Sequence, residues 1–276
     1  MSGSPFLFTS FLITSLFTSL ILGLAGTSAS AQDTSGGDDP LQALKERQDK
    51  ILQVVKNAQP AVVSITSRSR QGSGSGVIIN PEGLILTAGH VTSTTGDVLI
   101  IILPNGDEVP GEALGAHMSR DAGMARITTD RTDWPYVELG DPDEVTLGQW
   151  CVAIGHPGGF DKQRTAPIRA GKVLRKHKGF LVSDCTLAGG DSGGALFDLE
   201  GKLIGIHSSI SVSLAQNMHV AMDAFEGEDR KRMEADETWG ELSQAAVQPA
   251  MPSRKFPPPT VRPPVICFAT LSWCWL

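Results

Sequence analysis

The chain of 276 residues contains no block of basic residues, and its acidic side chains outnumber its basic ones. It has 30 Asp and Glu against 23 Lys and Arg, so its formal net charge is −7 at neutral pH. Nucleic-acid binding depends on clustered Lys and Arg that displace counterions from the phosphates. We therefore expect no nucleic acid among the partners of this protein.

Cysteine is also scarce, because the whole chain has four. Four are too few for a disulfide scaffold of this size, and they lack the short paired spacing of a zinc site. Cys151 and Cys185 lie in the body of the chain. There they would either form a disulfide in an oxidising compartment or remain two small buried apolar side chains. We expect neither a metal nor another cofactor.

Charge is missing from the N-terminus, where Asp33 is the first charged residue. An apolar stretch over residues 6–25, interrupted by Ser and Thr, is followed by Ala-Ser-Ala at 29–31, an A-x-A cleavage signal. This pattern predicts a signal peptide over residues 1–31 and an exported protein, periplasmic or secreted, although it lacks the usual basic start. The alternative is an uncleaved membrane anchor, because the apolar run approaches the roughly 20 residues that a bilayer span requires.

Other segments flank the body of the chain. Residues 32–57 predict a linker and then one amphipathic helix, with apolar residues at helical spacing from Leu41 and a stop at Pro60. Residues 226–246 are rich in charge with interspersed apolar side chains, and we expect a C-terminal helix there. Residues 247–276 are rich in proline and predict an extended tail, whose apolar end is too short to span a bilayer as a helix.

The body itself, residues 58–225, consists of short β-branched runs separated by turn signals such as Asn-Pro-Glu-Gly at 80–83. No helical segments alternate with these runs, so a parallel sheet with crossover helices is not expected. Many short strands at regular spacing indicate an all-β sandwich or barrel. The expected strands are residues 61–66, 76–79, 84–87, 98–103, 124–128, 150–154, 172–174, 180–183, 196–199, 203–208 and 218–222.

One glycine-rich loop carries the strongest functional signal. Residues 187–196 place four glycines around Ser192. Glycine permits positive φ and close backbone approach, so the loop can present a serine hydroxyl beside free N–H groups. An acyl-transfer nucleophile with an oxyanion hole requires this arrangement. The alternative is an ordinary glycine-rich turn with an incidental serine.

A serine nucleophile requires a base, and the base requires a carboxylate that orients it. Of the six histidines, His90 alone ends an apolar strand in a turn of small residues, Thr-Ala-Gly-His-Val at 87–91. Asp121 precedes the apolar run 122–127, where it would be shielded from water and still reach a neighbouring loop. We therefore select His90 as the base and Asp121 as its carboxylate partner.

Residues 190–194 also fit G-x-S-x-G, the nucleophile elbow of α/β-hydrolases. That motif needs a helix after the serine and the chain order Ser, Asp, His. Here the pattern strand, turn, strand follows Ser192, and the selected histidine lies far upstream. The elbow is excluded on both grounds.

The selected motifs resemble those of the trypsin/chymotrypsin-like serine proteases, which have the same chain order of His, Asp and Ser. The separations of 31 residues (90 to 121) and 71 residues (121 to 192) are similar to those of the compact bacterial HtrA/Deg branch. The resemblance covers about residues 50–225. It extends to Gly-Ser-Gly-Val-Ile-Ile at 74–79, Ala-Ile-Gly-His-Pro-Gly-Gly at 153–159 and Gly-Lys-Leu-Ile-Gly-Ile at 201–206.

This resemblance implies an all-β fold of two six-stranded antiparallel β-barrels, with a short N-terminal and a C-terminal helix and the active site between the barrels. It implies that Ser192 attacks the peptide carbonyl, that His90 transfers the proton and that Asp121 fixes the tautomer of His90. The N–H groups of Gly190 and Ser192 would form the oxyanion hole. Thr186 corresponds to the base of the primary specificity pocket. Its neutral side chain favours a small or medium apolar residue over Lys or Arg.

The sequence also departs from the HtrA pattern. Asp191 stands where Asn is usual, Ala195 where Pro is usual, and Ala-Gly at 122–123 where Leu-Ala is usual. Too few residues follow position 246 for the usual PDZ domain. Peptide recognition through such a domain is therefore not expected, and the oligomeric state is left open.

Two functions from different classes follow. The first is an exported serine endopeptidase that acts through an acyl-enzyme on unfolded or damaged envelope proteins. The alternative is a catalytically inactive protease fold that serves as a binding or chaperone-like module. The complete set of His, Asp and Ser favours the enzyme, because a decayed enzyme would be expected to lose one of the three.

Overall fold

The computed structural model describes residues 39–67, 72–92, 94–211 and 215–241. The chain divides into two units, residues 1–43 and residues 44–276. The predicted signal peptide and the predicted proline-rich tail lie outside the described residues. In the described part of the chain, no helix combines the length and the apolar character that a membrane span needs.

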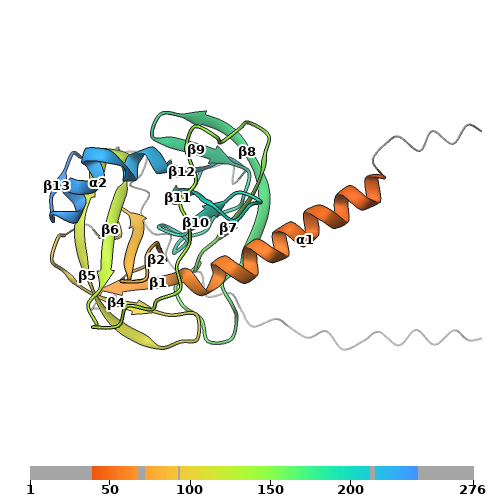
Figure 1. Cartoon of the computed structure of the whole chain (residues 1–276). Helices are drawn as coiled ribbons and strands as arrows, with labels where there is room; N and C mark the ends of the chain where they lie inside the picture. Colours follow the sequence, from red (N-terminus) through yellow and green to blue (C-terminus); the bar gives the residue numbers. More distant parts are fainter. Residues whose placement is uncertain (1–38, 68–71, 93, 212–214, 242–276) are drawn as a thin grey trace, which may run out of the picture. The chain divides into compact units, whose positions relative to one another are not determined.

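The larger unit begins with a closed barrel of six antiparallel strands (Figure 1). The strands follow the spatial order β5-β4-β1-β2-β3-β6, and pairing of β5 with β6 closes the barrel. Their bounds are β1 (Val62–Ser67), β2 (Ser73–Ile78), β3 (Leu84–Ala88), β4 (Val98–Ile102), β5 (Glu108–His117) and β6 (Ala122–Ile127).

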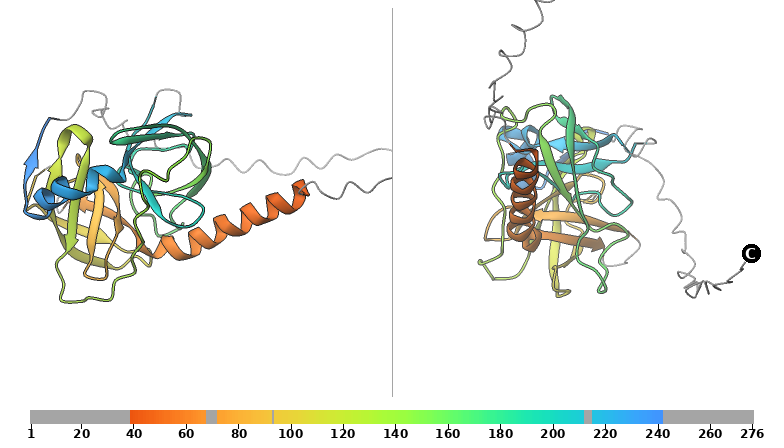
Figure 2. Two further views of the ribbon diagram at one scale, coloured as in Figure 1. Left: turned by 45° about the horizontal axis from the view of Figure 1, so that its top comes forward. Right: turned by 90° about the vertical axis from the view of Figure 1, so that its right-hand side faces the viewer.

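A second closed barrel follows, with the spatial order β10-β11-β12-β9-β8-β7. Its strands are β7 (Trp150–Ile154), β8 (Ile168–His177), β9 (Phe180–Ser183), β10 (Ala195–Phe197), β11 (Leu203–Ser209) and β12 (Asn217–Ala221). The left view of Figure 2 shows the two barrels side by side. The predicted fold class is thereby confirmed.

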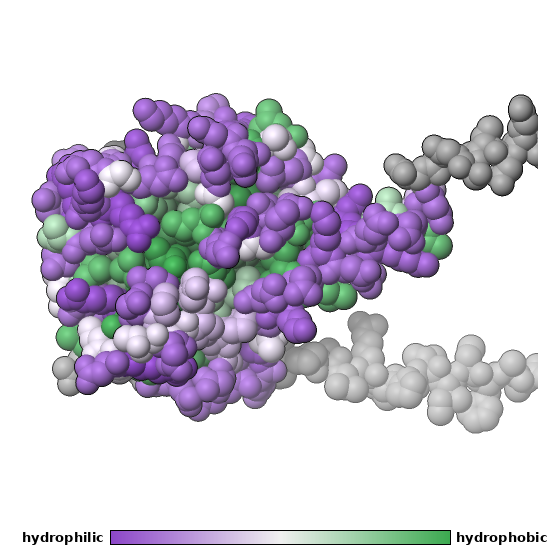
Figure 3. Space-filling view, viewed as in Figure 1, coloured by the Kyte–Doolittle hydropathy of each residue, from purple (hydrophilic) through white to green (hydrophobic). Residues whose placement is uncertain are grey.

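One apolar core holds the two barrels together. Ile78 and Leu86 of the first barrel and Ile154 and Phe197 of the second are fully buried and belong to one contiguous cluster. Each such side chain contributes about 1.5–3 kcal/mol by leaving water. On the face seen in Figure 3, apolar side chains gather in the middle and polar side chains surround them. Because the two barrels share this core, residues from both barrels keep fixed positions relative to one another at the site described below.

Helix α1 (Pro40–Ala58) confirms the predicted N-terminal helix. In the larger unit, Val54 of its last turns joins the core. Leu44, expected on the apolar face, is 57% exposed. This stretch of the helix meets the second barrel through a polar side chain, because the Arg47 guanidinium lies 4.4 Å from the centre of the Trp150 ring. Short 3-10 turns lie at η1 (Gln59–Ala61), η2 (Met118–Arg120) and η3 (Met222–Phe225).

Strand β5 was not expected from the sequence, because Pro110 and nearby glycines interrupt the β-branched pattern. Pro110 pairs with Ile100 of β4 in regular register, and the pairing of β5 with β6 shifts between Ala113 and Ala116. A Cβ at Gly115 would lie 2.0 Å from the carbonyl oxygen of Glu237. The glycine therefore reflects close approach of another segment and not a turn.

The predicted C-terminal helix over 226–246 is wrong in extent. Helix α2 spans only Gly227–Glu234, and strand β13 (Thr238–Trp239) then pairs in parallel with β5. Asp236 has a φ of 62°, a left-handed conformation that ends a right-handed helix. The charge pattern could not show that the following residues pair with a strand.

Candidate active site

His90 lies in the turn that follows β3. The N–H of Gly89 donates to the carbonyl of Asp121 at 2.8 Å, and a Cβ at Gly89 would lie 3.2 Å from the backbone carbon of Asp121. The absence of a side chain at Gly89 therefore lets this turn contact the turn before β6. The side chain of His90 is 30% exposed, so its ring stays accessible from solvent.

Asp121 follows η2 in a left-handed conformation, with a φ of 58°, and its side chain is 5% exposed. Its Oδ1 accepts the backbone N–H of His90 at 3.0 Å and lies 2.8 Å from His90 Nδ1, while Oδ2 lies 3.0 Å from the same nitrogen. An ionised carboxylate only accepts hydrogen bonds. The pairing therefore assigns the proton to Nδ1 and leaves Nε2 free to accept one. The structure brings together the predicted base and the predicted carboxylate.

Ser208 adds a partner that sequence reasoning missed. It lies on β11 of the second barrel, and its Oγ donates to Oδ2 of Asp121 at 2.6 Å. The carboxylate thus receives hydrogen bonds from both barrels. Nothing in the sequence distinguishes Ser208 from the neighbouring Ser209, so only the fold reveals this role.

Ser192 lies in the loop between β9 and β10. Gly190 and Gly193 on either side have φ values of 96° and 86°. A Cβ at Gly193 would lie 2.1 Å from both the carbonyl oxygen of Ser75 and Oγ1 of Thr87. At this position glycine is required for conformation and for space, as its place in the motif suggested.

Ser75 of β2 fastens this loop to the first barrel. Its N–H donates to the carbonyl of Ser192 at 2.7 Å, and its Oγ donates to the carbonyl of Gly190 at 2.8 Å. The same Oγ accepts the N–H of His156 at 2.9 Å. Ser75 is fully buried, so these bonds hold the backbone of the loop without competition from water.

The N–H groups of Gly190 and Ser192 point away from the protein interior. The carbonyls of their own peptide groups, those of Gly189 and Asp191, accept internal N–H donors at 2.6 and 2.8 Å. Because the C=O and N–H of a trans peptide point in opposite directions, the two N–H groups face the other way. Within the described residues neither donates a hydrogen bond, so both are free for a ligand.

Contacts through β11 connect Ser192 to Asp121. The N–H of Gly193, the residue after Ser192, donates to the carbonyl of His207 at 2.7 Å. Ser208, the residue after His207, binds Asp121. Within the part of the chain that the structure describes, Ser192 Oγ and His90 Nε2 make no hydrogen bond. Such contacts are often long in unliganded enzymes and tighten when substrate binds.

Thr186 is exposed, between the buried Cys185 and Leu187. It lies in the segment that leads from β9 to the Ser192 loop. The position is thus open to a ligand. Among the described residues, no contact of the Thr186 side chain assigns it to a pocket.

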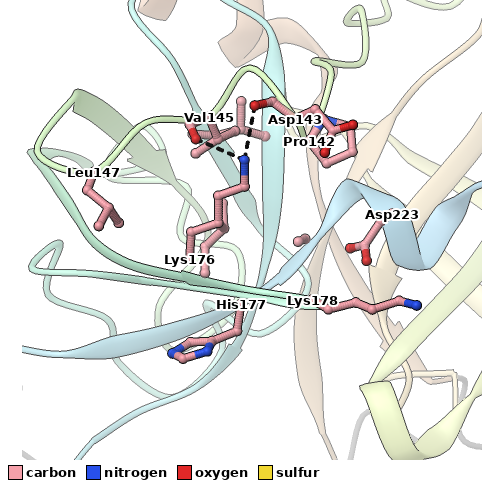
Figure 4. A pocket seen from close by; sticks show the side chains of 11 residues that line it. Pro142, Asp143, Val145, Leu147, Lys176, His177, Lys178 and Asp223 are labelled. Carbon is pink, nitrogen blue, oxygen red and sulfur yellow. Dashed lines mark hydrogen bonds between the residues drawn. The ribbon is translucent and has the colours of Figure 1, made fainter.

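A separate hollow of about 590 Å³ lies on the second barrel, between the segment before β7 and strand β8 (Figure 4). The Nζ of Lys176 donates to the carbonyls of Asp143 and Val145 at 3.1 and 3.0 Å, so it already has partners. His90, Asp121 and Ser192 do not line this hollow. We assign it no part in the chemistry.

The structure holds Cys151 and Cys185 as buried thiols that form no disulfide, with a hydrogen bond between their sulfur atoms at 3.8 Å. The hydrogen bond with Cys185 and burial raise the pKa of the Cys151 thiol. Within the described residues, no three His, Cys, Asp or Glu side chains converge as they would around a metal ion.

Residues 74–206 match the trypsin-like peptidase domain family. The two barrels agree with this match, so this stretch of the chain is similar to trypsin-like peptidase domains. The more particular resemblance to the HtrA/Deg branch is also confirmed, because both the related sequences and the related structures are of that type.

Two relatives are each named "Probable periplasmic serine endoprotease DegP-like". The one from Pseudomonas fulva (strain 12-X) is 35% identical over 168 residues, which cover 56% of this chain and 34% of that protein. The one from Halomonas elongata is 34% identical over 169 residues, which cover 57% of this chain and 35% of that protein. The chain thus spans about a third of the length of these relatives.

Solved structures give the same result. The HtrA-type protease AlgW with tripeptide superimposes with a TM-score of 0.59 at 27% identity, covering 68% of this chain and 64% of that one. The serine endoprotease from Yersinia pestis gives a TM-score of 0.56 at 27% identity, covering 67% and 65%.

Proposed function

We propose that the protein is an exported serine endopeptidase that uses His90, Asp121 and Ser192. The observation that carries the proposal is the contact of the buried Asp121 carboxylate with His90 Nδ1 at 2.8 Å. This contact leaves Nε2 as the nitrogen that can accept a proton, on a side chain that is 30% exposed. A general base in this state is what a serine hydroxyl needs in order to attack a carbonyl.

In the proposed reaction, Ser192 Oγ attacks the carbonyl carbon of the scissile peptide while His90 Nε2 takes its proton. The tetrahedral intermediate collapses to an acyl-enzyme as Nε2 returns the proton to the leaving amine. Water then attacks the acyl-enzyme with the help of the same nitrogen and frees Ser192. Asp121 stays ionised throughout and stabilises the imidazolium that forms in each step.

The N–H groups of Gly190 and Ser192 would bind the oxyanion of each tetrahedral intermediate. Their outward direction and their lack of partners among the described residues support this role. In sites of this kind each such donor contributes about 3–4 kcal/mol to transition-state stabilisation. The glycine at position 190 permits the positive φ that aims one of these donors.

Substrates are proposed to be unfolded or damaged proteins of the cell envelope. The names of the relatives in Pseudomonas and Halomonas support a periplasmic location. By the resemblance to trypsin-like proteases, Thr186 would lie at the base of the specificity pocket, and its neutral side chain supports cleavage after small or medium apolar residues. A charged substrate side chain would find no counter-ion on this residue.

The test uses the Ser192→Ala variant beside the wild-type protein. We expect the wild type to cleave casein and to react with a fluorophosphonate probe, and the variant to do neither while unfolding at the same denaturant concentration. Persistent labelling of the variant would contradict the assignment of Ser192. A folded wild type that is not labelled would instead support an inactive binding module.

A further inference from the structure

The Ser192 loop contains an acidic residue that the proposed reaction does not use. Asp191 lies between Gly190 and Ser192, the two residues whose N–H groups face outward. Its side chain points inward and is 1% exposed. Its Oδ2 accepts the N–H of Ala188 at 2.8 Å. The direction of this side chain and that of the two N–H groups are thus set by the same short stretch of backbone.

Both oxygens of Asp191 meet the guanidinium of Arg169. The Nη1 of Arg169 lies 3.1 Å from Oδ1, and Nη2 lies 2.5 Å from Oδ2. This is the two-pronged geometry in which Arg binds a carboxylate most strongly. The Arg169 side chain is 19% exposed. The pair is therefore largely shielded from water and from salt, unlike an ordinary surface ion pair.

Arg169 comes from a rigid part of the second barrel. It lies on β8, opposite Ala153 of β7 in the antiparallel ladder. The residue after Ala153, Ile154, pairs with Ala195 at the start of β10, directly after the Ser192 loop. The guanidinium thus reaches the loop from β8, and β8 pairs with β7, the strand that holds the residues directly after the loop. Because the backbone of Arg169 is paired in this ladder, it stays in place when the loop moves, and its side chain can hold the loop.

The groups around the Asp191 carboxylate restrict the positions that it can adopt. A Cβ at Gly155 would lie 2.6 Å from Asp191 Oδ1, so the protein backbone closely approaches that side of the group. Burial raises the pKa of Asp191, and the charge of Arg169 opposes that rise. Without a cation the buried charge would be uncompensated, and the loop would turn to bring the carboxylate to water. Such a turn would also redirect the peptide groups on both sides of Asp191.

We propose that Arg169 is the positioning residue of the nucleophile loop: its bidentate contact with Asp191 keeps the N–H groups of Gly190 and Ser192 directed outward. This inference rests on the proposed function of that site. Arg169 does not touch the substrate in this account. It acts through Asp191, and its loss should lower the rate of the chemical step more than it weakens substrate binding.

The test compares Arg169→Met with Arg169→Lys, with the double variant Arg169→Met/Asp191→Asn, and with Arg175→Met as the matched control. Arg175 is an exposed arginine on the same strand. We expect the rate of fluorophosphonate labelling to fall about 100-fold in Arg169→Met, the size of effect that small misplacement produces. Arg169→Lys should fall less, and Arg175→Met should stay within twofold of the wild type.

The double variant is the discriminating case. Replacing Asp191 with a neutral amide of the same shape removes the buried charge that needs a cation. We therefore expect the double variant to label at least tenfold faster than Arg169→Met alone. In a peptide substrate assay, kcat should fall in Arg169→Met while KM changes less than threefold.

Labelling of Arg169→Met at the wild-type rate would overturn the inference, and so would a double variant that labels no faster than Arg169→Met. Hydrogen exchange gives a readout independent of activity. Faster exchange confined to peptides covering residues 186–196 in Arg169→Met is expected, and unchanged exchange there would also overturn it. If the wild type is not labelled at all, the proposed function fails, and the exchange measurement still decides the role of Arg169.

Discussion

Each barrel contributes one buried aspartate to the site, and the two carboxylates have different partners. Asp121 of the first barrel is bound by a histidine ring and a serine hydroxyl. Asp191 of the second barrel is bound by the guanidinium of Arg169. The first carboxylate has no permanent cation beside it among these partners, whereas the second is paired with a guanidinium that stays charged.

The difference matches two different tasks. A carboxylate that assists proton transfer must stabilise a positive charge that appears only during the reaction, so its charge has to remain available. A carboxylate that shapes a loop has no such requirement, and a fixed cation holds it in place. The predictions below test this division of tasks, from the largest expected effect to the smallest.

Removing the charge of Asp121 should have the largest effect. In Asp121→Asn the amide can donate to Nδ1 and thus favour the wrong tautomer of His90, so kcat should fall about 10⁴-fold. The measurement is kcat for a peptide substrate, with Asp133→Asn, an exposed aspartate, as the control. A loss of less than tenfold in Asp121→Asn would contradict its role.

A substitution that moves the backbone of the Ser192 loop should lower activity almost as much. Gly193→Ala introduces a Cβ 2.1 Å from Ser75 O at a φ of 86°, and we expect kcat/KM to fall at least about 100-fold because the loop must move. Gly201→Ala is the matched control. Its φ is 85°, but nothing lies within 4 Å of the added Cβ. It should lower stability by about 1–2 kcal/mol and leave kcat/KM within twofold.

Equal activity losses in the two glycine variants would mean that backbone conformation alone sets the effect. The close contact between the loop and Ser75 would then have no separate importance. A larger loss in Gly193→Ala supports the fastening of the loop to the first barrel.

Ser208→Ala should have a smaller effect, because it removes one of several hydrogen bonds to Asp121. A hydrogen bond to a charged group contributes about 1.5–3 kcal/mol, so we expect kcat to fall about tenfold or somewhat more with little change in KM. Ser209→Ala on the same strand is the control. Steady-state kinetics of the two variants suffices, and identical values would exclude a contribution of Ser208 to the site.

The second barrel should also make stability depend on pH. His207 and His219 are buried side by side with Nδ1 atoms 3.0 Å apart, and burial lowers the pKa of His219 to about 3 and that of His207 well below its ordinary value. In the unfolded chain these two histidines take up protons below about pH 6.5, and in the folded chain they do so only at much lower pH. Stability is therefore fully present above that pH and is lost as pH falls from about 6.5 toward 3.

The slope should reach at most about 1.4 kcal/mol per pH unit for each histidine. Denaturant unfolding at pH 7.5, 6.5 and 5.5 measures it. His219→Gln should flatten the dependence, and His177→Gln, an exposed histidine of the same barrel, should not. A wild-type protein that gains stability over this range on acidification would contradict the buried neutral pair.

Much of this architecture is readable from the sequence, because local signals and tertiary structure agree. The β-branched runs, the turn at residues 80–83 and the glycines around Ser192 each predict what the structure contains. His90 and Asp121 could be chosen because each lies at the end of an apolar strand. Strand β3 ends where β6 begins, with Ala88 opposite Ala122, so the residues that follow β3 and precede β6 lie close together.

The remaining features depend on contacts between distant residues. Ser208 and Arg169 lie on strands with no pattern that marks their side chains, and each becomes important only through its partner in space. Strand β5 was missed because Pro110 and Gly115 usually signal turns, and here they serve a bulged strand. β13 was missed because its partner lies more than a hundred residues earlier in the chain.

The most direct test of the account is to locate the adduct after the wild-type protein reacts with diisopropyl fluorophosphate. Mass spectrometry of the digested protein should find one adduct per chain, on Ser192. The reaction should be much slower in Asp121→Asn, because His90 would no longer be held as the base. An adduct on another residue, or labelling of Asp121→Asn at the wild-type rate, would contradict the central claim that these residues from the two barrels form one catalytic unit.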